Sequence, residues 1–304
     1  MGSDAHVIVV GARADALAAA RELVEELEAR WSRFRPTSDV SVMNALAGRP
    51  VRVAPSTLAL VERAIAGVAI SGGRYDPTVL GAVISAGYDR SFERLDPADV
   101  PTDPMLRSGA DEILTDRSAG TVELPAAVGF DPGGIGKGFA ADLVVERLIL
   151  DGAEGACVNL GGDVRVEGQA PDGGAWAVGI RDPFEPATTT VAGLRSGAVA
   201  TSTRTRRTLG APAARRHHLI DPSSGRPAWN GLASATVIAA EGWQAEVLAK
   251  AAFVAGPGHG IDLLERASVD GLTVDDRGTV RSTAGFGRFS SRTIGSHGSS
   301  AGPR

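Results

Sequence analysis

A glycine-rich loop that leads directly into a helix lies near the middle of the chain. Residues 131–138 read Asp-Pro-Gly-Gly-Ile-Gly-Lys-Gly, and the apolar residues of 139–148 recur at helical spacing. Glycines allow the backbone to approach a ligand closely, and the first N–H groups of a helix lack intrahelical partners. Because the helix dipole also favours negative charge at this end, the loop predicts an anion-binding site.

This loop matches neither of the two standard phosphate-binding patterns. A Walker loop requires a glycine five residues before the Gly-Lys pair and a serine or threonine after it, whereas Asp131 and Gly138 occupy these positions. The glycine spacing also differs from that of a dinucleotide-binding fingerprint. Taken alone, the loop is equally consistent with a glycine turn that exposes Lys137 to solvent.

Strand-like and helix-like segments follow one another without regular alternation, which favours an α+β fold with mixed or antiparallel sheets and packed helices. One short strand is expected near Ile113, inside an otherwise irregular connection, and Ser56 is expected to cap the second helix. Helices are predicted at residues 15–33, from the Ser56 cap to the glycines at 72 and 73, and at 139–148 and 244–254, and strands at 6–10, 156–160, 163–167, 176–180 and 234–240.

Composition narrows the possible partners and compartments. The formal net charge of -5 argues against a broad nucleic-acid interface, and we expect the one basic cluster, residues 204–216, to be a solvated loop. Cys157 is expected to be a small buried apolar residue, since a lone cysteine forms no internal disulfide. Neither an N-terminal leader nor a bilayer-length apolar run is apparent, so we expect a cytoplasmic protein without a membrane span.

Six segments together resemble one family. They are Ser-Arg-Phe-Arg-Pro-Thr-Ser-Asp-Val-Ser-Val-Met-Asn at 32–44, Tyr-Asp-Pro-Thr-Val at 75–79, the loop and the helix start at 131–140, Val-Asn-Leu-Gly-Gly-Asp-Val-Arg at 158–165, Ala-Val-Ala-Thr-Ser at 198–202, and His-Leu-Ile-Asp-Pro-Ser-Ser-Gly-Arg-Pro at 218–227. In this order they resemble the ApbE family, the FAD:protein FMN transferases. Agreement across all six is too extensive for chance.

The resemblance implies an activity and a domain organisation. Family members bind FAD and, with a divalent cation such as Mg²⁺, transfer its FMN half to a Thr or Ser hydroxyl of an acceptor protein, with release of AMP. Some relatives hydrolyse FAD to FMN and AMP. We therefore expect one ApbE-like domain over residues 1–286, followed by a disordered tail over 287–304.

The resemblance also assigns roles to individual residues. His218 is expected to act as the general base, because an imidazole titrates near working pH, and Asp221 is expected either to orient it or to hold the fold. Asp163 and Asp182 are expected to be structural. The residues expected to contact FAD are Phe34, Asn44, Asp76, Asp131, Lys137 and Ile220.

One helix departs from the family pattern at the metal site. An Asp and a Thr, one turn apart, normally hold the metal there together with a loop carbonyl, which is expected to be that of Gly134. In this chain Glu246 replaces the Asp and Lys250 replaces the Thr, and an ammonium group cannot be a metal ligand. Either Lys250 pairs with Glu246 and puts its charge where the ion would sit, or the two form an ordinary exposed helix pair.

These departures leave three functional hypotheses. The first is FMN transfer to an acceptor protein, and the second is FAD pyrophosphatase activity. The third is a non-catalytic FAD-binding protein that has lost magnesium coordination.

Overall fold

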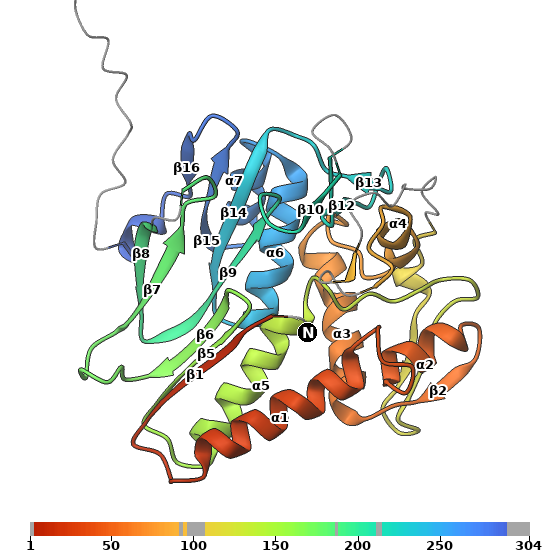
Figure 1. Ribbon diagram of the computed structural model, residues 1–304, viewed down its shortest axis with the longest axis horizontal. Helices are drawn as coiled ribbons and strands as arrows, with labels where there is room; N and C mark the ends of the chain where they lie inside the picture. Colours follow the sequence, from red (N-terminus) through yellow and green to blue (C-terminus); the bar gives the residue numbers. More distant parts are fainter. Residues whose placement is uncertain (1–2, 91–93, 96–106, 186–187, 211–214, 291–304) are drawn as a thin grey trace, which may run out of the picture.

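The structure is a computed structural model that describes residues 3–90, 94–95, 107–185, 188–210 and 215–290 (Figure 1). The N-terminal half of the chain is mainly helical, and most of the long strands follow residue 150. Part of the expected C-terminal tail, residues 291–304, lies outside the described residues.

A seven-stranded sheet with the order β1-β5-β6-β9-β14-β15-β16 forms the centre of the fold, and each neighbouring pair in it is antiparallel. This architecture confirms the α+β prediction. The strands are β1 (Ala5–Val10), β5 (Gly155–Leu160), β6 (Asp163–Gly168), β9 (Ser196–Thr203), β14 (Leu232–Ala239), β15 (Asp270–Asp275) and β16 (Val280–Ser282).

The remaining strands form small sheets at the periphery, each antiparallel. They are β2 (Pro50–Arg52), β4 (Thr121–Glu123) and β3 (Leu114–Asp116) in one sheet, and the pairs β7 (Trp176–Arg181) with β8 (Thr188–Leu194), β10 (Thr208–Leu209) with β11 (Arg216–His217), and β12 (Ile220–Asp221) with β13 (Arg226–Pro227). The helices are α1 (Ala16–Trp31), α2 (Asp39–Ala45), α3 (Pro55–Ile70), α4 (Leu80–Ser85), α5 (Gly136–Leu150), α6 (Gly242–Ala255) and α7 (His259–Arg266).

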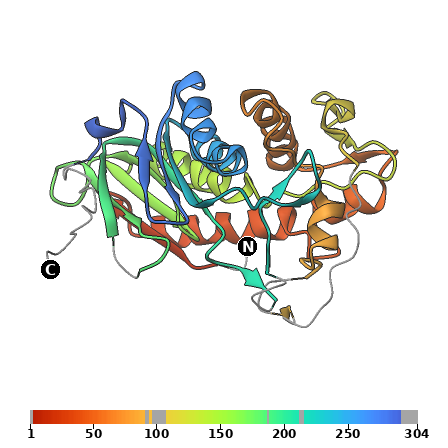
Figure 2. The ribbon, with the colours of Figure 1, turned by 90° about the horizontal axis from the view of Figure 1, so that it is seen from above.

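Both faces of the large sheet are covered. Helices α5 and α6 pack side by side against one face, as Figure 2 shows, and the β7-β8 hairpin covers the other. Side chains of β14 point alternately to the two faces of the sheet. Ala235 and Val237 pack in the cluster on the α6 face, whereas Ile238 packs in the cluster under β7-β8. Because β14 is central and covered on both faces, all its residues are buried and the strand lacks a polar alternation.

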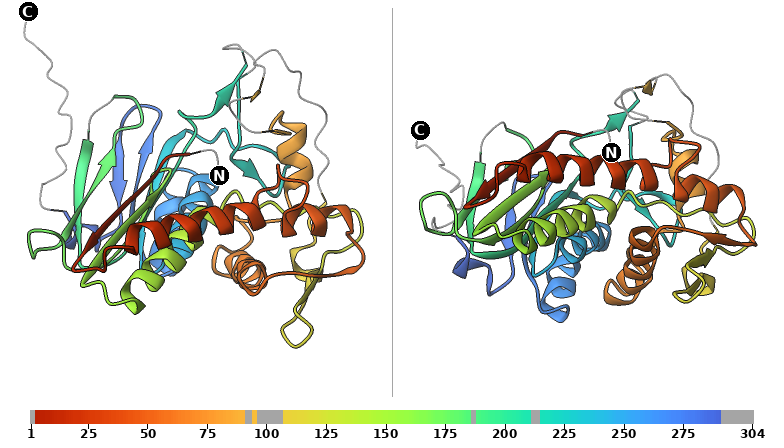
Figure 3. Two further views of the ribbon diagram at one scale, coloured as in Figure 1. Left: turned by 60° about the horizontal axis from the view of Figure 1, so that its bottom comes forward. Right: turned by 90° about the horizontal axis from the view of Figure 1, so that it is seen from below.

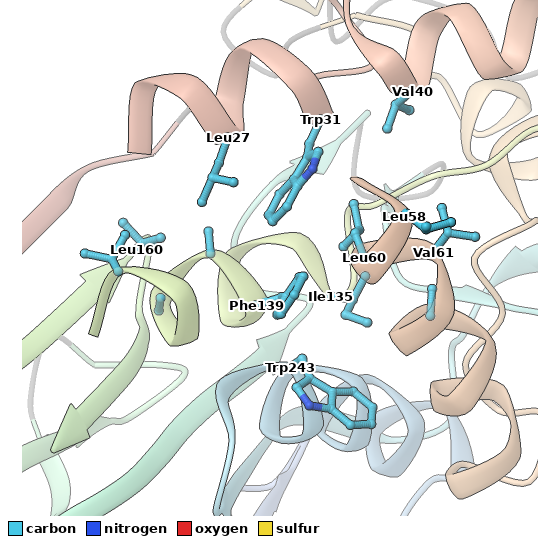
Figure 4. Packing of buried hydrophobic residues seen from close by; sticks show 14 of the residues in the cluster. Leu27, Trp31, Val40, Leu58, Leu60, Val61, Ile135, Phe139, Leu160 and Trp243 are labelled. Carbon is cyan, nitrogen blue, oxygen red and sulfur yellow. The ribbon is translucent and has the colours of Figure 1, made fainter. Parts of the chain in front are cut away.

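A second layer of helices lies across α5. Helix α1 runs from beside β1 toward α2, which is visible in both views of Figure 3. Its last residue, Trp31, stacks on Phe139 of α5 with 5.5 Å between ring centroids. Leu60 and Val61 of α3 join the same core (Figure 4). The glycine loop therefore enters α5 at the junction of α1, α3 and α6.

Several local predictions need correction. Helix α3 begins at Pro55, whose fixed φ suits the first turn, with Ala54 at the N-cap, so Ser56 does not cap it. Cys157 is half-buried at the edge of a core cluster, because it lies on β5 next to the edge strand β1. Among the described residues, no helix combines the length and the apolar character needed to cross a bilayer.

Candidate functional site

A pocket of about 190 Å³ opens where the glycine loop meets the end of α1 and the middle of α6. Its walls come from five parts of the chain that are distant in sequence, so only the tertiary fold creates it. The lining includes Trp31, Arg33, Phe34, Tyr88, Arg90, Asp131, Gly133, Lys137, Arg207, His218 and Lys250.

Positive charge dominates this lining. Arg33, Arg90, Arg207, Lys137 and Lys250 contribute cationic groups, and Glu28 and Asp131 contribute carboxylates. The charge of Lys137 is balanced by Asp163 and Glu246, which are not part of the lining. The N-terminus of α5 adds its dipole at the same place, because Gly136 is both the first helical residue and part of the wall. Such a lining is suited to a ligand with several negative charges, such as a pyrophosphate.

The loop itself is held at both ends. Asp131 donates its backbone N–H to the carbonyl of Pro77 at 2.7 Å, and its carboxylate accepts the N–H of Gly133 at 3.2 Å. Arg33 lies 3.4 Å from the same carboxylate, and its guanidinium stacks on the Phe34 ring at 4.2 Å. Arg33 thereby links the acidic end of the loop to an exposed aromatic face at the pocket mouth.

Lys137 lies between two buried carboxylates. Its ammonium donates to Asp163 on β6 and to Glu246 on α6, and the second oxygen of Glu246 accepts the N–H of Gly138 at 2.8 Å. Burial alone would lower the pKa of Lys137, but the two carboxylates outweigh that effect and raise it. Lys137 is therefore a permanent cation that ties α5, α6 and the sheet together.

Glu246 is consequently not the partner of Lys250. The expected Glu246–Lys250 pair is wrong, because the two oxygens of the Glu246 carboxylate accept hydrogen bonds from Lys137 and Gly138 instead. Lys250 instead lies against Gly134: a Cβ at Gly134 would meet Lys250 Nζ at 2.4 Å. Burial lowers the pKa of Lys250, and the nearby charges of Asp131 and Glu246 oppose that shift.

The residues around Gly134 do not fit a magnesium ion. Mg²⁺ requires an octahedron of oxygen ligands, whereas Lys250 directs an ammonium group to the backbone at Gly134 and Glu246 is already bonded to Lys137 and Gly138. No group of three or more His, Cys, Asp or Glu side chains suitable for a metal occurs in the part of the chain that the structure describes. Magnesium coordination by Gly134 and Glu246 stays a prediction that rests on the resemblance. The groups around Gly134 do not favour it.

His218 contributes a neutral imidazole to the pocket. Burial lowers its pKa well below 6.5, and the positive charge of Lys250 acts in the same direction. Its buried Nδ1 has no hydrogen-bond partner among the described residues, and its ring meets Tyr88 edge-on at 6.0 Å. At neutral pH this ring is thus able to accept a proton.

The neighbouring His217 has a different role. It is fully buried and packs edge-on against Trp229 at 4.7 Å and Phe253 at 5.9 Å. Its Nδ1 accepts the N–H of Leu219 at 3.3 Å, and burial lowers its pKa to about 4. His217 is a core residue, and the two adjacent histidines point into different surroundings.

Two of the predicted ligand contacts support the pocket from outside. Asn44 exchanges two hydrogen bonds with the backbone of Phe130, at 3.0 and 2.7 Å, and so fixes the chain just before Asp131. Asp76 is buried and accepts the Thr78 N–H at 2.7 Å together with the hydroxyl of Ser108. Neither lines the pocket, so their contact with FAD stays a prediction.

The two remaining predicted residues, Ile220 and Asp221, are not part of the pocket lining. Ile220 is buried in an apolar cluster with Val83 and Tyr88. Asp221 accepts the N–H and the hydroxyl of Ser223, at 2.9 and 2.7 Å, which forms the turn between β12 and β13. Among the described residues it makes no hydrogen bond to His218, so of the two roles expected for Asp221 the structure displays the structural one.

Sequence reasoning missed several contacts of the site. Asp163 was expected to be structural, but its partner was not foreseen: it is the first residue of β6 and pairs with Lys137. The expected solvated loop at 204–216 needs correction for its described residues, and residues 211–214 lie outside the described ranges. Arg204 bonds to the Leu232 carbonyl and lies over Trp229, Arg216 is buried, and Arg207 lines the pocket. No local pattern marks these positions, since each contact joins segments far apart in sequence.

Comparisons with known proteins show which family the chain belongs to. The model of the ApbE family matches residues 1–273. The FAD:protein FMN transferase of Treponema pallidum is 33% identical over 287 residues, which cover 87% of this chain and 78% of that protein. The corresponding protein of Vibrio cholerae is 28% identical over 280 residues, with coverage of 90% and 81%.

Solved structures of ApbE proteins share the fold of this chain. The crystal structure of the ApbE protein from Thermotoga maritima superimposes with a TM-score of 0.83 at 27% identity, over 94% of this chain and 99% of that one. The flavin transferase ApbE from Vibrio cholerae reaches a TM-score of 0.81 at 25% identity, with coverage of 95% and 96%. With the family match spanning most of its length, this chain belongs to the ApbE family.

Proposed function

We propose that this chain is an FAD:protein FMN transferase. Two relatives that match this chain over most of their own length are named FAD:protein FMN transferase. The observation that carries the proposal is the cationic pocket at the glycine loop, which combines an anion-binding helix start with a neutral imidazole at His218. FAD presents the matching features, because its pyrophosphate lies between two planar ring systems.

The proposed reaction is a substitution at phosphorus. The hydroxyl oxygen of a Thr or Ser on the acceptor protein attacks the phosphorus of the FMN half, and the bond from that phosphorus to the bridging oxygen breaks. AMP leaves with the bridging oxygen, FMN becomes a phosphoester of the acceptor, and the hydroxyl proton is released. Catalysis then consists of positioning, charge neutralisation and removal of that proton.

The pocket residues divide these tasks. His218 is the proposed base, since its lowered pKa leaves the imidazole neutral at pH 7. Arg33 and Arg207, both in the lining, neutralise the pyrophosphate. Phe34, 43% exposed, offers an aromatic face to one ring of FAD. No step in this scheme is assigned to magnesium.

The test is incubation of the purified protein with FAD and a Thr-containing acceptor, followed by chromatography for AMP and in-gel flavin fluorescence of the acceptor. We expect equal amounts of AMP and flavinylated acceptor, with no fluorescence on an acceptor whose target Thr is replaced by Val. AMP and free FMN without labelled acceptor would identify an FAD pyrophosphatase. Tight FAD binding without any AMP would identify a non-catalytic flavin-binding protein.

A further inference from the structure

The two lysines of this chain lie in the same pocket. Of 31 lysine and arginine residues, only Lys137 and Lys250 are lysines, and both line the cavity at the glycine loop. An ammonium is a compact point charge, whereas a guanidinium is a broad planar fork. The chain therefore places its only two side-chain ammonium groups at the site where a small, strong charge suits a phosphate ligand.

These two ammonium groups are not equivalent. Lys137 is neutralised by Asp163 and Glu246, so it has little charge to offer a ligand. The two carboxylates whose charges act most on Lys250 are engaged elsewhere: Asp131 pairs with Arg33, and Glu246 pairs with Lys137. Lys250 forms no ion pair within the described ranges of the chain, and its charge is directed into the pocket.

The position of Lys250 is equally specific. Helix α6 carries it one turn after Glu246, and its Nζ lies against the backbone of Gly134, two residues before α5 begins. Gly134 has no side chain, so the ammonium can approach the loop where a metal ion would need the Gly134 carbonyl. An ammonium has three N–H donors and no lone pair, so it excludes a cation from this place while donating to phosphate oxygens itself.

We propose that the Lys250 ammonium takes the place of a divalent cation and binds the FAD pyrophosphate, so that this chain handles FAD without magnesium. The proposal rests on the proposed function for the identity of the ligand. During transfer, negative charge develops on the AMP phosphate as the bond to the bridging oxygen breaks, and Lys250 stabilises that charge by donating hydrogen bonds. It supplies one positive charge where Mg²⁺ would supply two, and Arg33 and Arg207 lie in the same lining.

The scarcity of lysine makes a direct test practical. Selective ¹³C labelling of the lysine side chains gives one εCH₂ signal each for Lys137 and Lys250, assigned with the Lys250→Met variant. We expect FAD to shift the Lys250 signal in the presence of EDTA. Mn²⁺, added in place of Mg²⁺ at a stoichiometric amount, should leave that signal sharp, with or without FAD. Paramagnetic loss of the Lys250 signal would show a cation bound beside it and would overturn the proposal.

Variants add readouts that do not depend on turnover. Lys250→Met should weaken FAD binding about tenfold or more in EDTA, because one charged hydrogen-bond donor is lost. Lys250→Arg keeps the charge and should lose less affinity. The double variant Glu246→Asp/Lys250→Thr should gain stoichiometric Mn²⁺ binding in the presence of FAD, measured by electron paramagnetic resonance. Unchanged FAD affinity in a folded Lys250→Met protein would refute the role of the ammonium.

Failure of this proposal and failure of the proposed function give different results. AMP release that stops in EDTA and returns with Mg²⁺ would leave the transferase assignment intact and make the role of Lys250 wrong. If FAD shifts the Lys250 signal in EDTA and Mn²⁺ does not broaden it, but neither acceptor nor water yields AMP, the ammonium site stands and the transferase assignment fails.

Discussion

At the scale of single residues, Gly134 controls where the Lys250 ammonium lies. A Cβ at this position would meet Lys250 Nζ at 2.4 Å, which a flexible side chain relieves easily, and a ring carbon of the buried Tyr75 at 3.0 Å, which has less room to move. We therefore expect Gly134→Ala to lower the free energy of unfolding by about 1–2 kcal/mol. FAD affinity should fall about tenfold, because Lys250 is displaced. Isothermal titration calorimetry and urea unfolding measure the two effects.

The matched control for this variant is Gly287→Ala, where no atom other than those of its chain neighbours lies within 4 Å of the new Cβ. It should change neither FAD affinity nor stability. If Gly134→Ala binds FAD as tightly as Gly287→Ala, the loop does not position Lys250 for the ligand.

His218 makes a second prediction at this scale, concerning pH. A base acts in its neutral form, and the pKa of His218 lies well below 6.5, so the acid limb of kcat/KM should fall below pH 6.5. His218→Gln should lower kcat by about 100-fold or more while leaving FAD affinity within a few fold. A pH–rate profile and a binding titration test both statements. Full activity of His218→Gln would assign proton removal to another group.

At the scale of elements, the N-terminal ends of α5 and α6 meet through glycines. A Cβ at Gly138 would lie 2.2 Å from the Gly242 carbonyl oxygen, and backbone on both sides prevents relief. Asp142 completes the joint by accepting the N–H groups of Gly242 and Trp243, at 2.6 and 3.0 Å. We expect Gly138→Ala to destabilise the protein by about 3 kcal/mol or to prevent folding, as judged by urea unfolding.

The same helix offers a control for that substitution. At Gly136 a Cβ would approach only Pro132, at 3.5 Å, and alanine favours a helix. Gly136→Ala should retain wild-type stability within about 1 kcal/mol. Equal stability of Gly138→Ala and Gly136→Ala would show that α5 and α6 can move apart at Gly138 and Gly242 without loss of stability.

At the scale of the whole molecule, stability should depend on pH through the buried His217. Its folded pKa of about 4 lies below the unfolded value of 6.5, so the unfolded chain binds the extra proton. This contribution is fully present above pH 6.5 and is lost as pH falls toward 4. Between pH 7 and 5 the loss is about 2 kcal/mol, at about 1.4 kcal/mol per pKa unit.

Asp142 changes the stability with pH in the opposite direction to His217. A His217 variant is therefore needed to separate the two contributions. Burial raises the pKa of Asp142 to about 6, and this contribution grows as pH falls through that value. Urea unfolding of wild type and His217→Gln at pH 7 and pH 5 isolates the contribution of His217 to the free energy of unfolding. The variant should lose about 2 kcal/mol less than wild type between the two pH values. An equal loss in both proteins would contradict a buried, neutral His217.

Apolar periodicity in the chain was enough to predict most of the regular elements, and the ordered motifs were enough to indicate the family. The helix after the glycine loop and the strands at 156–160, 163–167 and 176–180 followed from apolar spacing, because burial on one face repeats with the period of the element. Six ordered segments were sufficient to indicate the family, which the comparisons then confirmed. The departure of Lys250 from the metal-binding pattern was visible in the sequence through the resemblance to the family.

Which charged side chains pair with one another became clear only from the packed fold. Lys137 and Glu246 are 109 residues apart, and their ion pair forms because α5 and α6 approach through Gly138 and Gly242. Asn44 and Phe130 are 86 residues apart, so no local pattern showed that Asn44 supports the loop instead of lining the pocket. The physical reason is general: side-chain periodicity reflects a residue's own element, whereas ion pairing and pocket lining depend on distances between elements that only the packed fold sets.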